Sequence, residues 1–141
     1  MQAIQQVLAG RSRYTGAELA ELTNDIAARR NASPEHIVLG EILDVLGLYL
    51  SARGSPDGEF VCSEPGYTAL VDAVAPAGGV VVGVPLNERL KNDLPAISGK
   101  VGERARAVYF VNTHNPSGTV SEPAQSIDFV RAYARDRRLS W

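Results

Sequence analysis

The sequence has few of the residues that build disulfides and metal centres. Its 141 residues include one cysteine, Cys62, and two histidines, His36 and His114, which lie far apart in the chain. A lone cysteine excludes an internal disulfide and a cysteine-based zinc site. Neither histidine has a cysteine or carboxylate partner at metal-ligand spacing, so the sequence indicates no metal site. Because Phe60 and Val61 precede Cys62, we expect a thiol buried in a strand rather than a nucleophile.

Long apolar runs and an excess of one charge are also absent. No segment approaches the roughly 18 apolar residues that are needed to span a bilayer, and no basic and then apolar leader opens the chain. We therefore expect a cytoplasmic protein that has no membrane partner. The formal net charge of -2 is spread along the chain, which gives no electrostatic basis for binding nucleic acid.

The usual nucleotide and hydrolase motifs are missing as well. The chain contains no Gly-x-Gly-x-x-Gly segment and no Walker-type glycine loop. It also lacks a Gly-x-Ser-x-Gly elbow, so a serine hydrolase has no support. The nearest feature is Gly40, a single glycine between an expected strand and an expected helix.

Apolar segments with the strand period alternate with segments of helical period. Hydrophobic residues make up 45% of the chain, enough for one buried core. We expect strands at residues 37–39, 59–62, 80–84 and 107–111, and helices at 1–9, 17–30, 41–50, 68–74 and 121–138. The third strand, almost all valine, should be covered on both faces, and the helix from residue 41 should be buried. The alternation predicts an α/β domain with three layers, in which helices flank a mostly parallel sheet.

The fourth expected strand runs into the segment NTHNPSGT at residues 112–119. Loops that follow the carboxyl ends of parallel strands bind ligands, so we expect His114 and Asn115 to face a crevice. The alternative is an ordinary exit from a strand into a loop. Tyr67 lies in a similar place after the second strand, where its ring can stack on a planar ligand or pack at the start of a helix.

Three segments in this order resemble the large domain of a known family. They are EPGY at residues 64–67, APAGG at 75–79 before the valine strand, and NTHNPSGT at 112–119. Together they resemble the fold type I, class I/II aminotransferases that depend on pyridoxal 5'-phosphate (PLP), and most of all the histidinol-phosphate branch. The resemblance implies the N-terminal part of a large domain, incomplete within residues 1–141. Residues 1–35 would form N-terminal helices and a link near the cofactor, and residues 36–141 the sheet core.

The resemblance assigns cofactor contacts to several residues. Asn115 would hydrogen-bond the 3-oxygen of the pyridine ring, and Tyr67 would stack on that ring. Tyr14 would reach the cofactor phosphate of a partner subunit, which implies a homodimer, although Thr15 stands where the family has proline.

The phosphate end of the site departs from the family pattern. There, backbone amides at a helix N-terminus hold the phosphate, which places Gly40 and Glu41 at this end. The junction at Gly40 and Glu41 is shorter than the family's by about three residues, which leaves little loop around an anion.

The reaction implied by the resemblance is amino-group transfer between an amino acid, such as histidinol phosphate or an aromatic amino acid, and a 2-keto acid. Lys91 and Lys100 are the only lysines, and neither matches the family's cofactor-binding lysine. We therefore expect no catalytic residue in this chain and no activity from the chain alone. Two alternatives remain: a non-catalytic α/β module that dimerises or binds a ligand, and a PLP-dependent decarboxylase of the same fold.

Overall fold

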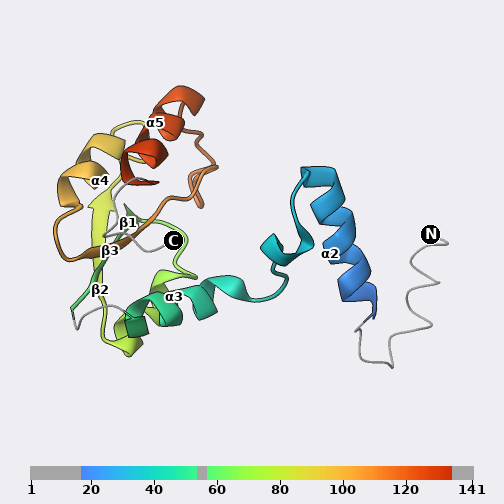
Figure 1. The fold of residues 1–141 in the computed structure, drawn as a ribbon. Helices are drawn as coiled ribbons and strands as arrows, with labels where there is room; N and C mark the ends of the chain where they lie inside the picture. The colour runs from blue at the N-terminus through green and yellow to red at the C-terminus, as the bar shows by residue number, and fades with distance from the viewer. Residues whose placement is uncertain (1–16, 54–56, 135–141) are drawn as a thin grey trace. The chain divides into compact units, whose positions relative to one another are not determined.

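The computed structural model describes residues 17–53 and 57–134, which divide into two compact units at residues 42 and 43 (Figure 1). The first unit holds α2 (Ala17–Arg30) and the short 3-10 helix η1 (Pro34–His36). Helix α2 matches the expected bounds, with Glu18 in its first turn and Arg29 and Arg30 in its last, as the helix dipole favours. The helix expected at residues 1–9 lies outside the described residues.

The second unit is built on three parallel strands. Its elements begin with α3 (Ile42–Arg53) at the unit boundary, and they continue with β1 (Glu59–Glu64), η2 (Val71–Ala73), η3 (Ala75–Ala77), β2 (Val80–Pro85), α4 (Leu94–Lys100), β3 (Ala105–Tyr109) and α5 (Pro123–Ala134). Strand β1 lies in the centre of the sheet, in the order β2-β1-β3. In the register of the sheet, Phe60 pairs with Val81 on one side and with Ala107 on the other. The expected parallel α/β fold is confirmed.

Two apolar clusters cover the two faces of this sheet. Successive side chains of a strand point to opposite faces, so the fully buried Phe60 and Val61 belong to different clusters. Phe60 packs with Leu70 and Val74, against which Leu43 of α3 lies. Val61 packs with residues of α4 and α5, among them Ile97 and Phe129. The unit therefore has three layers, with α3 on one face of the sheet and α4 and α5 on the other (Figure 1).

Two expected elements are wrong. Residues 37–39 form no strand, and Val38 is 66% exposed, because no strand among the described residues pairs with this segment. The helix expected at 68–74 is replaced by η2 and η3. Proline at the start of η3 and a left-handed Gly78 at its end leave room only for short turns.

The expected burial of two elements is also wrong in part. Val80 and Val81 are each 39% exposed, because they start a strand at the edge of the sheet. On α3, Val45 and Tyr49 are more than half exposed, since only one side of this helix packs on the core. Cys62 is buried in β1, as expected. None of the described helices is both long and apolar enough to cross a membrane.

Candidate functional site

The candidate site lies where the chain leaves β1 and β3 in opposite directions. These adjacent parallel strands end at the same edge of the sheet. After β1 the chain enters η2, on the face that α3 covers, whereas after β3 it enters α5, on the other face. Such a divergence opens a crevice at the carboxyl ends of the two strands, the place where open α/β sheets bind ligands.

A small pocket occupies this crevice. Its empty volume is about 180 Å³ including open solvent, but the space that a water-sized molecule can occupy is only about 10 Å³, room for about one water. The lining residues come from the ends of β1 and β3 and from the loop before α4: Cys62, Ser63, Gly66, Tyr67, Asn92, Tyr109, Val111 and His114. Tyr67 is 47% exposed, so part of its ring is available to a ligand. The cavity therefore has room for one small polar group rather than for a whole ring.

Two ionisable side chains that line the pocket, Cys62 and Tyr109, have raised pKa values. Burial raises the pKa of the Cys62 thiol, and the carboxylate of Glu64 raises it further. Burial also raises the pKa of Tyr109, with smaller contributions from Tyr67 and Cys62. A thiol with a raised pKa is a poor nucleophile at neutral pH. The Cys62 thiol is therefore protonated at neutral pH and unsuited to covalent attack.

His114 is the most buried polar residue of the pocket, with 1% of its surface exposed. Its Nδ1 lies 2.8 Å from Ser117 Oγ. Its Nε2 has no hydrogen-bond partner among the residues that the structure describes. The backbone closes around it, because His114 N donates to the carbonyl of Thr119 and Gly118 N donates to the carbonyl of His114.

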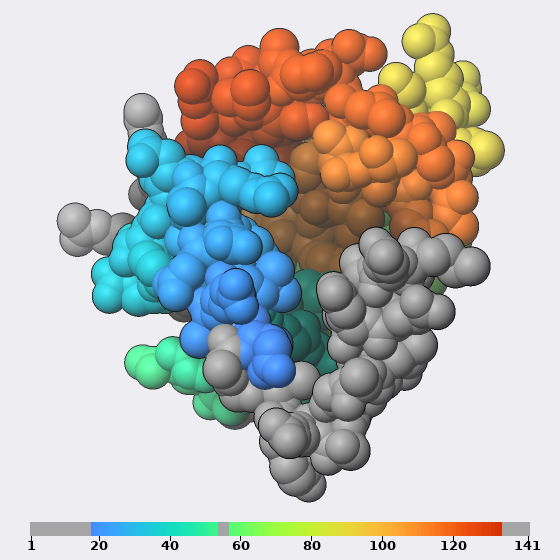
Figure 2. All heavy atoms as spheres, turned by 90° about the vertical axis from the view of Figure 1, so that its right-hand side faces the viewer, coloured from blue at the N-terminus to red at the C-terminus, as the bar shows by residue number. Residues whose placement is uncertain are grey.

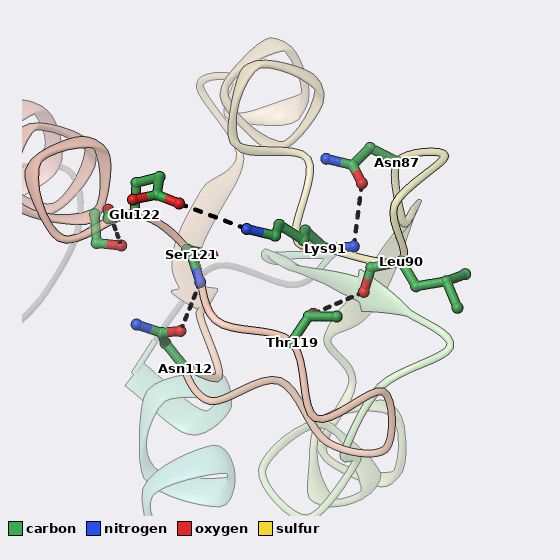
Figure 3. Close-up of polar contacts among 8 residues, drawn as sticks. Asn87, Leu90, Lys91, Asn112, Thr119, Ser121 and Glu122 are labelled. Carbon is green, nitrogen blue, oxygen red and sulfur yellow. Dashed lines mark hydrogen bonds and ion pairs between the residues drawn. The ribbon is translucent and has the colours of Figure 1, made fainter.

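Two loops hold each other in place beside the pocket. Ser117 Oγ and Thr119 Oγ1 both lie within hydrogen-bond distance of the Leu90 carbonyl oxygen, at 2.9 and 2.8 Å. Lys91 Nζ lies 3.7 Å from a carboxylate oxygen of Glu122 (Figure 3). The segment before α4, in yellow, and the segment after β3, in orange, lie side by side on the surface (Figure 2). These contacts restrain the loop that carries Asn115.

Asn92 joins the two strand ends, and no motif in the sequence singled it out. This residue is 5% exposed. Its Oδ1 accepts a hydrogen bond of 2.6 Å from Ser63 Oγ, and its Nδ2 donates one of 3.0 Å to the carbonyl of Val111. Asn92 therefore sets the spacing between the turn that carries Tyr67 and the loop that carries Asn115.

The predicted site residues fall in three places. Tyr67 lines the pocket, and Asn115 is exposed in the loop next to buried His114. A cis peptide joins Asn115 to Pro116, a conformation that bonds before proline adopt far more readily than others. Gly40 and Glu41 are exposed in the first unit, where the Gly40 carbonyl accepts a hydrogen bond from Ile42 N.

The remaining candidates lie elsewhere. Tyr14 is outside the described residues. Lys91 pairs with Glu122, Lys100 ends α4, and neither lysine lines the pocket. Within residues 17–53 and 57–134, no group of three or more histidine, cysteine or acidic side chains is placed to hold a metal ion.

The fold and the pocket define a parallel α/β domain with a pocket at a topological switch point, the place where sheets of this kind bind ligands. The family model "Aminotransferase class I and II" matches residues 1–136. The chain belongs to this aminotransferase family.

Relatives and solved structures agree with the family. The chain is 32% identical to the aromatic amino acid aminotransferase of Thermobifida fusca over 92% of this chain and 36% of the relative. It is 30% identical to the histidinol-phosphate aminotransferase of Desulfotalea psychrophila over 94% of this chain and 35% of the relative. The structure of histidinol-phosphate aminotransferase from Sinorhizobium meliloti in complex with pyridoxal-5'-phosphate is similar, with a TM-score of 0.77 and 29% identity over 93% of this chain and 36% of that one. The sequence thus spans about a third of the length of these proteins.

Proposed function

We propose that this chain is an incomplete large domain of a PLP-dependent aminotransferase and that it supplies the part of the site that holds the cofactor ring. One observation carries the proposal: Tyr67 and the Asn115 loop flank one pocket at the carboxyl ends of adjacent parallel strands. A half-exposed aromatic ring and an unpartnered buried nitrogen fit a planar ligand with polar edges. The similarity to the PLP-bound histidinol-phosphate aminotransferase extends over 93% of this chain. This similarity supports PLP as the ligand.

Each residue has a distinct part in this proposal. Tyr67 stacks on the pyridine ring and keeps water from one face, and Asn115 donates a hydrogen bond to the ring's 3-oxygen. Bound PLP supplies an electron sink for the amino acid's α-carbon. Gly40 and Glu41 would face the phosphate, but Ile42 N, an amide of that helix start, already donates to the Gly40 carbonyl. The ring end is therefore the better supported half of the site.

The parent reaction would transfer an amino group from an amino acid, such as histidinol phosphate or an aromatic amino acid, to a 2-keto acid. The names of the relatives support this choice. Because both lysines lie outside the pocket, the chain would be inactive by itself. We also propose that it forms a homodimer, which the broad apolar exposure of α3 supports.

Binding of pyridoxamine 5'-phosphate, followed by calorimetry, tests the proposal. This form has no aldehyde, so it cannot react with surface lysines. Tyr67→Ala should weaken binding about two- to tenfold, as expected for a lost stacking contact. Tyr49→Ala is the matched control, since Tyr49 has a similar exposure of 53% and does not line the pocket.

Asn115→Ala should also weaken binding about two- to tenfold through the lost hydrogen bond. If the unaltered chain shows no saturable binding, the non-catalytic module becomes the better description of this protein.

A further inference from the structure

The histidine of the NTHNPSGT segment has one ring nitrogen whose role the proposed function leaves open. His114 is almost completely buried, and its Nε2 has no partner among the described residues. Leaving a buried polar atom unpaired costs about 1–3 kcal/mol, so folded proteins rarely do so without a compensating role. The ring lines the same pocket as Tyr67 and Asn92. The unpaired nitrogen itself has almost no exposed surface, but it belongs to a side chain of the pocket wall, where a bound ligand would lie next to it.

The neighbouring hydroxyl groups indicate which nitrogen carries the proton. Ser117 Oγ, Thr119 Oγ1 and the Leu90 carbonyl oxygen form three mutual contacts of 2.8–2.9 Å. Each hydroxyl has one proton, so these contacts share two protons. If the Ser117 hydroxyl donated its hydrogen bond to His114, only the Thr119 proton would remain for the three contacts. Two of these contacts would then bring oxygen lone pairs together. The arrangement is better satisfied when Ser117 keeps its proton within this group and accepts a hydrogen bond from Nδ1 of His114.

This assignment fixes the chemistry of Nε2. In a neutral imidazole with the proton on Nδ1, the other nitrogen is a hydrogen-bond acceptor. Space beside it is kept open by Gly66, where an added Cβ would lie 3.7 Å from Nε2 and would clash with the Ser63 carbonyl. Nε2 is thus a buried acceptor beside the turn that carries Tyr67.

We propose that His114 Nε2 accepts a hydrogen bond from an N–H or O–H group on the edge of an aromatic ring that stacks on Tyr67. The inference rests on the proposed function, in which this ring is the pyridine of the cofactor. The inference adds His114 to the residues that contact the ligand. Only a ligand with a hydrogen-bond donor on the edge of its ring can satisfy the buried Nε2. An apolar ring of the same size would leave the nitrogen unpaired.

Long-range ¹H–¹⁵N spectra of the histidine rings test the inference on the whole chain. The sequence has two histidines, and exposed His36 serves as the internal reference. Without ligand, we expect His114 to carry its proton on Nδ1. On saturation with pyridoxamine 5'-phosphate, the Nε2 resonance of His114 should shift and that of His36 should not.

Three variants give an independent measurement. His114→Asn keeps a donor near the position of Nδ1 but removes the acceptor, so affinity for pyridoxamine 5'-phosphate should fall about two- to tenfold. His114→Gln places an amide oxygen near the position of Nε2 and should bind within about twofold of the unaltered chain. His36→Asn, the matched control, should bind like the unaltered chain.

The outcomes separate this inference from the proposed function. A proton on Nε2 in the free chain overturns the inference alone. Saturable binding that leaves the Nε2 resonance unshifted also overturns it, and such a result would leave the cofactor site standing with water at the nitrogen. If the unaltered chain does not bind pyridoxamine 5'-phosphate, both proposals fail.

Discussion

Replacing Asn92 by aspartate should destabilise the chain strongly, although the two side chains have nearly the same shape. The retained oxygen can still accept the hydrogen bond from Ser63 Oγ. The other oxygen replaces the donor Nδ2 and faces the carbonyl oxygen of Val111, which the native amide reaches at 3.0 Å. The change therefore removes one hydrogen bond, takes this partner from the half-buried Val111 carbonyl and places a charge at a site that is 5% exposed.

The size of the effect follows from these losses. A buried hydrogen bond contributes about 0.5–1.5 kcal/mol, and an unsatisfied buried group costs about 1–3 kcal/mol. We expect Asn92→Asp to lower the free energy of unfolding by about 2–4 kcal/mol. With a urea dependence of about 2 kcal/mol per molar, in the middle of the usual range, the unfolding midpoint should fall by roughly 1–2 M. Circular dichroism at a fixed protein concentration measures this shift.

A matched control comes from the same loop. Asn87 is only half-buried, and its Oδ1 accepts hydrogen bonds from the backbone N–H groups of Arg89 and Lys91. Figure 3 shows the contact with Lys91, and a carboxylate accepts such bonds equally well. Asn87→Asp should therefore change the unfolding free energy by less than about 0.5 kcal/mol. Equal losses in the two variants would refute the reasoning, because the donor of Asn92 would then have no special importance.

The destabilisation should depend on pH with a definite sign. Burial beside a carbonyl raises the pKa of the introduced carboxyl in the folded state above its unfolded value of about 3.9. The loss relative to the unaltered chain is fully present above the folded pKa. It shrinks as pH falls and disappears below the unfolded pKa, where the protonated carboxyl can donate to Val111.

Two further predictions concern packing and pH. Gly47→Ala should lower the unfolding free energy by about 1–3 kcal/mol, because its Cβ would clash with the Leu70 carbonyl. Gly99 also lies in a helix, but a Cβ added there would have no atom within 4 Å. Gly99→Ala should therefore leave the unfolding free energy unchanged or raise it by up to about 1 kcal/mol. If urea unfolding shows Gly99→Ala to be the less stable variant, the packing of α3 is contradicted. Burial raises the pKa of Cys62 above its ordinary 9.0 in the folded state, so the free energy of unfolding should begin to fall as pH rises past 9.0. Cys62→Ala should make this fall less steep. An unchanged slope in the variant would contradict the raised pKa of Cys62.

The elements that the sequence predicted well are those with local signals. The helical period predicted a helix at residues 17–30, and α2 has these bounds in the structure, with Arg29 and Arg30 in its last turn. The apolar runs of β1, β2 and β3 were also recognised. Residues 37–39 have a similar composition, yet a strand needs a neighbour, and the short apolar pattern carries no information about one.

The candidate site was predicted only in part for the same reason. The turn residues around Asn115 and the aromatic residue at position 67 are visible in the sequence as loops after strands. Asn92 meets Ser63 across 29 positions of sequence, and neither residue belongs to a motif. The proton assignment of His114 depends on the contact between Ser117 and the Leu90 carbonyl oxygen. This contact forms only when the two loops have folded against each other.

The ring end of the proposed site is self-contained within the second unit. Tyr67, His114 and the bridging Asn92 all lie between β1 and the loop after β3, and their positions depend on hydrogen bonds within that segment. Gly40 and Glu41, proposed for the phosphate, lie in the first unit. Variants of Tyr67, Asn92 or His114 therefore report on the second unit alone.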